Sequence, residues 1–494
     1  MPSALTYPGV YIEEVSSGVR TITGVATSIA LFLGWARRGP IDRAVRISNF
    51  TDYQRAFGVL DKGSLLGYGV KHFFDNGGAE AYVLRLADTA AAKVSKVTIG
   101  SLAIEASSPG KWGDSYDIKI TPRSDDTSHF RLQVLDRDNN NAPVESFENL
   151  SVASADPRFA ASAINDRSAF IKVTVGAAPT TPTADTKPLA GGDNGTELKP
   201  DTANFKNALL AQFGIGTVTD RIDIFNLVCV PGETDPTTLG ALQTACKNRR
   251  AFLIADAPST ATVTTMDADL NPALRSSDAP YSAMFFPWVK APDPLQEDAL
   301  VDFPPCGFVA GVFARTDSSR GVWKAPAGSE ATLNGATGLS ITMSDAENGH
   351  LNPRGINCLR TLPVYGNVVW GSRTMHGQSD RGSEWKYIPV RRMASFLEES
   401  LYRGTQWVVF EPNDEPLWAQ IRLNIGAFMQ NLFRQGAFQG KSPREASFVK
   451  CDRETTTQTD INLGIVNILV GFAPLKPAEF VVLKLQQIAG DIPT

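Results

Sequence analysis

Histidine is the side chain that most often supplies general bases and zinc ligands, and this chain contains four of them. None is part of a His-Glu-x-x-His pair or of another spacing that predicts a zinc site. The four positions are His72, His129, His350 and His376. Nucleotide binding has equally weak support, because no Gly-x-x-x-x-Gly-Lys-Ser/Thr loop is present and the Gly214-Ile215-Gly216 turn lacks a third glycine. We therefore predict no catalytic residues, no metal and no cofactor.

Two acidic positions could carry chemistry, but each has a plainer interpretation. Asp136, Asp138 and Asn140 have the spacing that begins a calcium loop. Phe147 stands where the bidentate glutamate should be and the required glycine is missing, so a polar hairpin turn is favoured. Asp256 directly follows a buried strand, and ligand sites in open α/β sheets lie at such strand ends. Because no nucleophile or histidine partner can be assigned to it, a turn or capping role is favoured.

The composition is that of an ordinary globular protein. Of 494 residues, 43% are hydrophobic and 20% are charged, and the net charge of -5 is too small to predict a nucleic-acid or membrane-surface partner. The length predicts about two to four domains of roughly 100–200 residues each. Five scattered cysteines without a Cys-x-x-Cys pair indicate buried, reduced thiols. No stretch reaches the ~18 apolar residues of a spanning helix and the start lacks an export signal, so we expect folding in the cytoplasm.

Both ends of the chain carry apolar strand patterns. Alternation over residues 7–15 predicts a short strand without a hairpin partner nearby, and the apolar run 29–33 predicts a buried strand. Near the other end, 466–472 and 480–485 are strand candidates, and prolines in the intervening loop 473–479 stop both strands. This pattern predicts a C-terminal hairpin whose edge an extended arm can join.

Between the ends, strands and helices alternate. Residues 223–230 have a buried-strand pattern, and a helix follows with Asp235 as its cap and Pro236 in its first turn. A second strand at 251–255 completes a β-α-β unit of a parallel layer. Farther along, apolar residues at helical spacing predict an amphipathic helix around 393–401.

The longest predicted helix runs from about Glu415 to Gln435 and ends at Gly436. Its apolar face consists of Leu417, Trp418, Ile421, Ile425, Phe428, Met429 and Leu432. Residues 91–200 differ, because their apolar residues alternate as in strands around polar turns. We interpret this part as a β-rich insertion that ends in a loose Ala/Thr/Pro/Gly linker near 176–200.

Several longer motifs resemble those of contractile tail sheath proteins. The C-terminal third carries EWKYIPVRR at 384–392, RGTQWVVFEPNDEPLW at 403–418, FVKCDRET at 448–455 and GFAPLKPAEFV at 471–481. Similar motifs occur at 7–14 (YPGVYIEE), 37–40, 73–78, 321–328 and 351–357. Residues from about 91 to 220 contain only one short and weakly similar motif, KWG at 111–113. The resemblance therefore covers most of the chain but not this middle segment.

The resemblance implies a multidomain α+β or α/β fold. It would contain a mixed-sheet core built from both chain ends, a central α/β domain, a β-rich inserted domain and extended terminal arms. The implied division is an N-terminal exchange arm at 1–20, the first part of the core at 21–90, the β-rich insertion at 91–200, an α/β domain at 201–349 and a C-terminal core with a terminal hairpin at 350–494.

A member of this family would be a structural subunit rather than an enzyme. It would polymerise helically around an inner tube and shorten to drive that tube through a target cell envelope. The implied partners are other copies of the chain, the inner tube protein, and baseplate and tail-terminator or cap proteins, with no nucleic acid and no direct membrane insertion. The chain would be made in the bacterial host cytoplasm and end in the tail of a phage virion or phage-like contractile particle.

The resemblance also implies which residues join subunits. Strand exchange would involve Tyr7, Val10, Tyr11, Ile12, Val15, Val466, Ile468, Val470, Phe480, Val482 and Leu483. A charged helix would contact the tube through Arg391, Arg392, Glu398, Glu399 and Arg403. A solvated helix face with i,i+4 ion pairs accounts for the same charges equally well.

Two other interpretations remain open at this stage. An α/β enzyme with a cleft near Val230–Gly232 and Asp256 would bind a small molecule as a discrete oligomer. A non-contractile tube or shell protein would polymerise in one fixed lattice.

Overall fold

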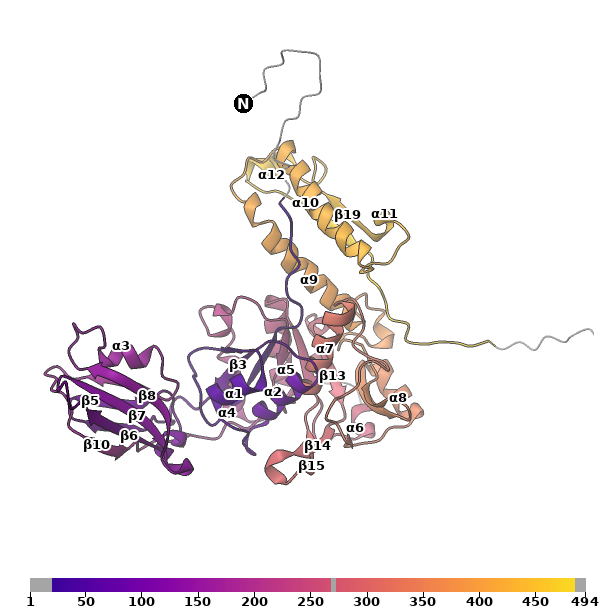
Figure 1. Cartoon of the computed structure of the whole chain (residues 1–494). Coiled ribbons are helices and arrows are strands. Elements are labelled where there is room, and N and C mark those ends of the chain that lie inside the picture. The colour runs from indigo at the N-terminus through magenta and orange to yellow at the C-terminus, as the bar shows by residue number, and fades with distance from the viewer. Residues whose placement is uncertain (1–19, 268–271, 485–494) are drawn as a thin grey trace, which may run out of the picture. The chain divides into compact units, whose positions relative to one another are not determined.

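The computed structural model describes residues 20–267 and 272–484 (Figure 1). Their contacts divide them into two compact units, which we call the central unit (26–392) and the C-terminal unit (20–25 together with 393–484). The border falls inside helix α9 (Ile388–Gly404). The strand predicted at 7–15 lies outside the described residues.

An eight-stranded mixed sheet forms the middle of the central unit. Its strands, in spatial order, are β18 (Gly366–Val369), β17 (Ile356–Leu362), β13 (Ser282–Phe286), β12 (Phe252–Asp256), β11 (Leu227–Cys229), β1 (Ala30–Trp35), β3 (Ala81–Leu86) and β2 (Val45–Ile47). The six inner strands are parallel, and the two edge strands run antiparallel to their neighbours. Parallel inner strands are typical of sheets covered by helices on both faces.

Strand β1 shows why both faces are covered. Ala30 and Phe32 belong to the hydrophobic cluster that includes α2 (Leu65–Asp75) and α7 (Cys306–Arg320). Leu31 and Leu33 belong to a second cluster. That cluster includes α4 (Ala203–Leu210) and α5 (Pro236–Asn248). Successive side chains of a strand point to opposite faces, so an apolar run of this kind needs a helical layer on each side. Outside the β-rich segment, the unit also contains α1 (Phe50–Phe57), α6 (Val263–Asp267) and α8 (Asp345–Leu351).

The β-α-β prediction is confirmed, although its first strand is shorter than expected. β11 spans only 227–229 and pairs in parallel with β12. Between them, the Asp235 carboxylate accepts a hydrogen bond from the backbone N–H of Thr238 and caps α5, with Pro236 in the first turn. The buried strand predicted at 29–33 is β1.

The mixed sheet takes strands both from the predicted N-terminal part of the core (21–90) and from the predicted C-terminal core (350–494). Its strands come from 30–86 and 227–369, and none comes from the described residues after 369. β17 and β18 follow residue 350, and the division into compact units falls later, inside α9. The first four residues of β17 are fully buried, as expected for a strand inside the sheet.

The segment expected to be β-rich contains two sheets around one core. One is β4 (Lys96–Ile99), β5 (Leu102–Ala106) and β9 (Ile171–Val175). The other is β10 (Asp185–Pro188), β6 (Tyr116–Pro122), β7 (His129–Asp136) and β8 (Ala142–Ser151), and α3 (Ala160–Asn165) completes the segment. The loose linker predicted near 176–200 is wrong in part, because β10 lies inside it and pairs with β6. The 136–141 stretch is the β7–β8 turn, with Asn140 and Asn141 left-handed at φ 53° and 55°.

A further sheet of the central unit consists of β14 (Val289–Asp293), β15 (Ala299–Phe303) and β16 (Gly338–Leu339). Among the described residues, no helix is long and apolar enough to cross a membrane. In the same part of the chain, no group of three or more His, Cys, Asp or Glu side chains is arranged to hold a metal ion.

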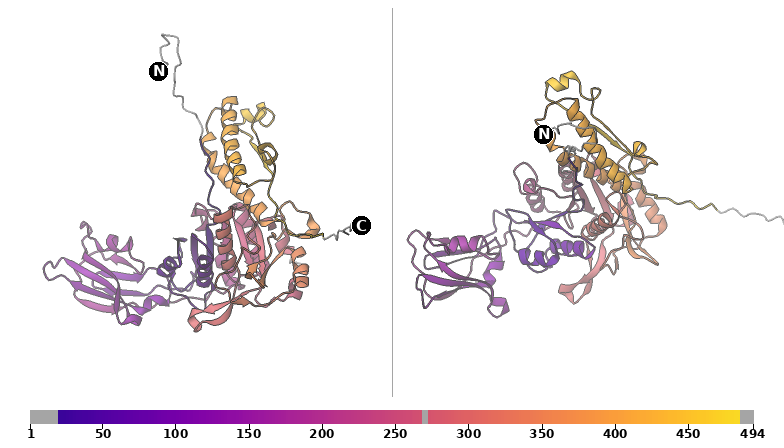
Figure 2. Two further views of the ribbon diagram at one scale, coloured as in Figure 1. Left: turned by 45° about the vertical axis from the view of Figure 1, so that its right-hand side comes forward. Right: turned by 45° about the horizontal axis from the view of Figure 1, so that its top comes forward.

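The C-terminal unit is built around α9 and α10 (Glu415–Arg434). The rings of Phe396 and Phe428 are 6.3 Å apart, and the two helices run side by side (Figure 2). All seven residues predicted for the apolar face of α10 are buried, and Gly436 after the helix is left-handed at φ 79°. The remaining elements are α11 (Pro443–Ala446), β19 (Ser447–Lys450), α12 (Gln458–Asn462) and β20 (Leu469–Phe472).

Candidate assembly surfaces

β19 and β20 form a two-stranded antiparallel ribbon in which Ser447 lies opposite Phe472. The predicted hairpin of 466–472 with 480–485 is therefore wrong, because β20 takes an earlier strand as its partner. Phe448 and Leu469, one on each strand, are 49% and 52% exposed. Two-stranded ribbons are marginally stable alone and offer unpaired edges. An apolar ribbon of this kind is suited to accept a further strand.

The segment after β20 exposes a run of apolar side chains. Residues 475–484 have no regular secondary structure, and Phe480, Val482 and Leu483 are 74%, 78% and 83% exposed. Of the other residues predicted for strand exchange, Val470 lies in β20, whereas Val466 and Ile468 precede it. Tyr7, Val10, Tyr11, Ile12 and Val15 lie outside the described residues. A contiguous exposed apolar run is a common mark of an interaction site.

The charged residues predicted for α9 fall into two groups. Arg391 and Arg392 are each only 4% exposed, so the prediction that they belong to an exposed charged face is wrong. Glu398 is exposed, and Arg403 forms an i,i+4 ion pair of 2.7 Å with Glu399. Of the five predicted residues, Glu398 is therefore exposed, and the side chains of Arg403 and Glu399 are 36% and 15% exposed.

The contacts of Arg392 show why the side chains at the start of α9 are buried. Its guanidinium nitrogens lie 2.9 and 2.5 Å from the two carboxylate oxygens of Asp317, which is 2% exposed. The same group donates to the Thr27 carbonyl at 2.9 Å and lies 5.0 Å from the centre of the Phe313 ring. Arg391 lies 4.2 Å from the Trp385 ring centre. A buried arginine with a bidentate carboxylate is satisfied internally and is not a surface group.

Asp256, the candidate catalytic residue, is 1% exposed and has a structural role. Its carboxylate accepts hydrogen bonds from the backbone N–H groups of Gly232 and Cys306, at 3.0 and 2.7 Å. Cys306 is the first residue of α7, so Asp256 satisfies one of the free N–H groups at that helix end. The capping interpretation is confirmed.

Burial gives Asp256 a measurable pH signature. Desolvation raises its pKa from 3.8 to about 6 despite the two hydrogen bonds. Because the folded-state pKa is raised, the stabilising contribution of this group is complete below pH 3.8 and is lost as the pH rises through about 6. We expect Asp256→Asn to remove this dependence, which amounts to ~3 kcal/mol at 1.36 kcal/mol per unit. Urea unfolding of both proteins at pH 4 and 7.5 measures it, and identical pH dependence would contradict it.

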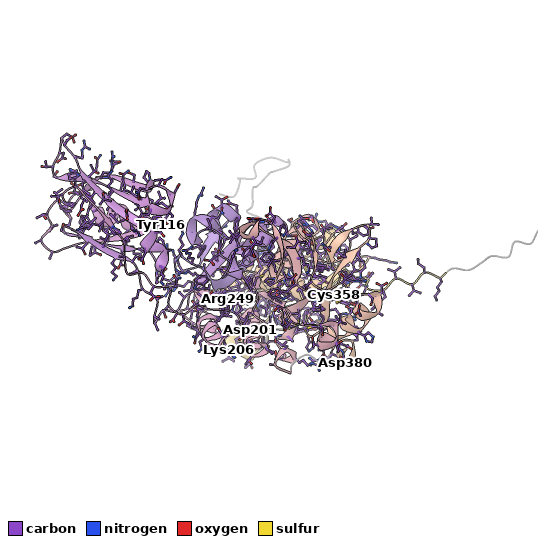
Figure 3. The ribbon with its side chains drawn as sticks, turned by 90° about the horizontal axis from the view of Figure 1, so that it is seen from below. Tyr116, Asp201, Lys206, Arg249, Cys358 and Asp380 are labelled. Atoms are coloured by element: carbon purple, nitrogen blue, oxygen red, sulfur yellow. The ribbon has the colours of Figure 1, made fainter. Side chains whose placement is uncertain are left out.

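A second buried carboxylate lies at the start of α5. The Glu233 carboxylate accepts hydrogen bonds from the backbone N–H groups of Asp201 and Asp235, at 2.9 and 3.2 Å. Desolvation raises its pKa to about 7. Lys206 Nζ lies 3.4 Å from an Asp235 carboxylate oxygen, and the Asp235 N–H donates to Asp201 at 2.9 Å; Figure 3 labels Asp201 and Lys206. These contacts hold the chain that follows the β-rich segment against the turn between β11 and α5, so the role of Glu233 is structural.

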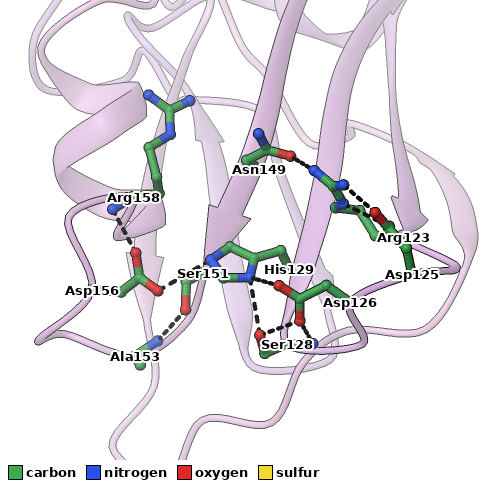
Figure 4. Close-up of polar contacts among 10 residues, drawn as sticks. All are labelled: Arg123, Asp125, Asp126, Ser128, His129, Asn149, Ser151, Ala153, Asp156 and Arg158. Atoms are coloured by element: carbon green, nitrogen blue, oxygen red, sulfur yellow. Dashed lines mark hydrogen bonds and ion pairs between the residues drawn. The ribbon is translucent and has the colours of Figure 1, made fainter.

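A histidine of the β-rich segment lies between two acidic side chains (Figure 4). His129 places Nδ1 2.6 Å from Asp126 and Nε2 3.1 Å from Asp156. Ser128 Oγ also approaches Nδ1, at 2.9 Å. The serine and the Asp126 carboxylate thus share one ring nitrogen and the other is held by Asp156, so the imidazole cannot relay a proton between them as in a nucleophilic triad. Hydrogen bonds, chiefly from Ser128 to Asp126 and from the Arg158 N–H to Asp156, lower the pKa of both carboxyl groups.

Comparison with protein families gives matches over both units. A model described as the phage tail sheath protein central domain matches residues 222–375. A model described as the phage tail sheath C-terminal domain matches residues 380–488.

Curated relatives match shorter segments. The tail sheath protein of Vibrio phage KVP40 is 28% identical over 189 residues, which are 38% of this chain and 27% of the relative. A putative prophage major tail sheath protein of Pseudomonas aeruginosa is 23% identical over 180 residues, 36% of this chain and 44% of the relative. The matches therefore span less than half the length of either relative.

Solved structures match the whole chain. The helical sheath of the anti-feeding prophage in its contracted state is 25% identical, with a TM-score of 0.60 over 98% of this chain and 100% of that one. The contracted sheath complex of an extracellular contractile injection system, PVC, gives 24% identity and a TM-score of 0.61, with 98% of each chain covered. A sheath tail protein of Listeria innocua gives 12% identity and 0.63 over 92% and 96%.

These matches overturn the α/β enzyme interpretation, in agreement with the structural role of Asp256. They also replace the alternative of a non-contractile tube or shell. The chain belongs to the contractile tail sheath family of phages and extracellular contractile injection systems, whose members are structural and not enzymes.

Proposed function

We propose that this chain is the repeating subunit of a contractile sheath, which polymerises helically around an inner tube and shortens to drive that tube through a target envelope. The observation that carries the proposal is the whole-chain likeness to a helical sheath in its contracted state. In this mechanism, subunits are held in an extended lattice on the tube and are released into a shorter lattice with more buried interface.

Strand exchange between subunits would hold this polymer together. The apolar run at 480–483 and the two-stranded β19–β20 ribbon are complementary, since one is an extended donor and the other has unpaired edges. Both are on every chain at different places, so donation from one copy to the next is head-to-tail and does not close on itself. Such contacts generate a helix. Residues 7–15 would supply a second donated strand.

Contact with the inner tube would use the exposed side of α9. Glu398, Glu399 and Arg403 remain on that surface, and the pair of Glu399 with Arg403 is partly exposed. Exposed ion pairs contribute only ~0–1 kcal/mol each. A surface of this kind gives many weak contacts that can release together when the lattice changes. Baseplate and cap proteins would bind the two ends of the polymer, and assembly would take place in the host cytoplasm.

Removal of residues 1–15 tests the exchange of arms. We expect the truncated chain to remain a folded monomer and to form no sleeves, because polymer growth would lose one donated strand. Circular dichroism checks the fold and negative-stain electron microscopy counts the sleeves, with the full chain at the same concentration as control. Long ordered sleeves from the truncated chain would contradict the proposed exchange.

A further inference from the structure

Residues 20–25 cross the C-terminal unit as a single extended segment. They have no regular secondary structure and lie beside α9 (Figures 1 and 2). Ile22 is only 6% exposed, whereas Thr21 and Thr23 on either side of it are exposed. The segment therefore packs one side chain inward although no strand pairs with it among the described residues.

Two buried polar side chains take the place of a partner strand. The backbone N–H of Arg20 donates to Asn424 Oδ1 of α10, and that of Val25 donates to Ser400 Oγ of α9, each at 3.2 Å. Asn424 is 3% exposed and Ser400 is fully buried. Buried polar groups need hydrogen-bond partners, so these two side chains favour an extended backbone at this place.

Two glycines allow the close approach. A Cβ atom added at Gly404 of α9 would lie 2.6 Å from Ile22 Cγ2. A Cβ atom added at Gly24 would lie 2.9 Å from Cζ of Phe396. Both distances are shorter than real Cβ contacts, so with a larger residue at either position Ile22 or Phe396, or the segment itself, must shift. Glycine within a helix costs ~1 kcal/mol relative to alanine, and at 404 the close contact accounts for it.

The Arg20 end of the segment has unused hydrogen-bond donors. The Arg20 guanidinium lies 4.7 Å from the Trp407 ring centre. Trp407 Nε1 and Asn424 Nδ2 are buried, and neither has an acceptor in the described part of the chain. Both side chains contact Arg20, where the described chain begins. Two buried donors at this end of the segment are therefore not satisfied by the described residues.

We infer that residues 20–25 are the fixed root of the N-terminal arm. Ile22, Gly24 and Gly404 are positioning residues that hold the root on α9 and α10, and Asn424 and Trp407 contact its first residue, Arg20. The inference rests on the proposed arm exchange. The consequence is that the arm begins at the same place in every subunit. Force applied to the arm is transmitted to α9 and α10, because residues 20–25 stay bound to these helices.

A matched pair of glycine substitutions tests the root. In Gly404→Ala the new methyl group meets Ile22, whereas in Gly426→Ala, on α10, it meets nothing within 4 Å. We expect Gly404→Ala to stay folded, to exchange the Arg20 and Val25 amide protons at least tenfold faster, and to form at least tenfold fewer sleeves. Gly426→Ala should match the wild type in both. Gly24→Ala, a change on the segment itself, should behave as Gly404→Ala does. Equal exchange and equal sleeve yield in all the proteins would overturn the inference.

A covalent lock tests whether the root stays in place during shortening. A Cβ at position 404 would lie 3.1 Å from the Cβ of Ile22, slightly closer than the ~3.5–4.5 Å of a disulfide, and Ile22→Cys removes the Cγ2 atom that this Cβ would meet at 2.6 Å. Ile22→Cys with Gly404→Cys, closed with oxidised glutathione, should assemble and shorten like the wild type. Sleeves that shorten only after reduction would show that the root must leave α9, which overturns the inference. A wild-type chain that forms no sleeves of two lengths would instead count against the proposed function.

Discussion

Replacement of Arg392 by alanine is expected to lower the free energy of unfolding by about 3–5 kcal/mol. The substitution leaves the Asp317 carboxylate, 2% exposed, without the cation that contacts both of its oxygens. It also removes the hydrogen bond to the Thr27 carbonyl and the contact with Phe313. An uncompensated buried charge is costly because its desolvation is no longer offset. Urea denaturation with an unchanged m-value measures the loss.

The chain supplies a matched control on the same helix as Asp317. Arg320 forms a 2.9 Å pair with Glu330, and the two side chains are 52% and 67% exposed. Arg320→Ala should therefore change stability by no more than about 1 kcal/mol. The double change Arg392→Met with Asp317→Leu should recover most of the loss, because neither buried charge remains. A cost for Arg392→Ala as small as that for Arg320→Ala would contradict the role assigned to this pair.

Charges placed in the exposed apolar run are expected to abolish polymerisation without unfolding the chain. Phe480→Asp with Val482→Asp adds two carboxylates to side chains that are 74% and 78% exposed. Stability should change by less than about 0.5 kcal/mol for each, as is usual for surface positions. In the polymer, the same carboxylates would have to be buried against a neighbour's ribbon, which is strongly unfavourable. We expect at least a hundredfold fewer sleeves by electron microscopy.

Val59→Asp is the control for a single exposed apolar residue outside the ribbon and the terminal segment. Val59 is 69% exposed and belongs to the central unit. Its replacement should leave sleeve formation within a few-fold of the wild type. Normal sleeves from the Phe480 and Val482 double variant would mean that this segment is not donated to another subunit.

Local patterns could be read from the sequence where they depend on near neighbours. The apolar face of α10 repeats at helical spacing over five turns, so its buried side could be assigned residue by residue. The cap of α5 needs only Asp235, Pro236 and Thr238, which are adjacent in the chain. The same holds for the alternating strands β6 and β7.

Contacts between distant residues could not be read in this way. β20 has an apolar pattern that fits any partner strand, and its choice of β19 over 480–485 depends on the packing of the C-terminal unit. The burial of Arg392 depends on Asp317, 75 positions away, and nothing near Arg392 distinguishes it from a surface arginine. The family could be identified because long motifs, unlike single residues, specify a fold together. The residues 20–25 had no pattern that predicted their binding to α9 and α10.

Helical reconstruction by electron cryomicroscopy of sleeves formed by the full chain on its inner tube tests the central claim most directly. The account predicts two lattices of the same chain, one long around the tube and one shorter and wider after release, with residues 480–483 of one copy paired to the β19–β20 ribbon of another in both. A single fixed lattice, or discrete compact oligomers in the presence of the tube, would contradict it.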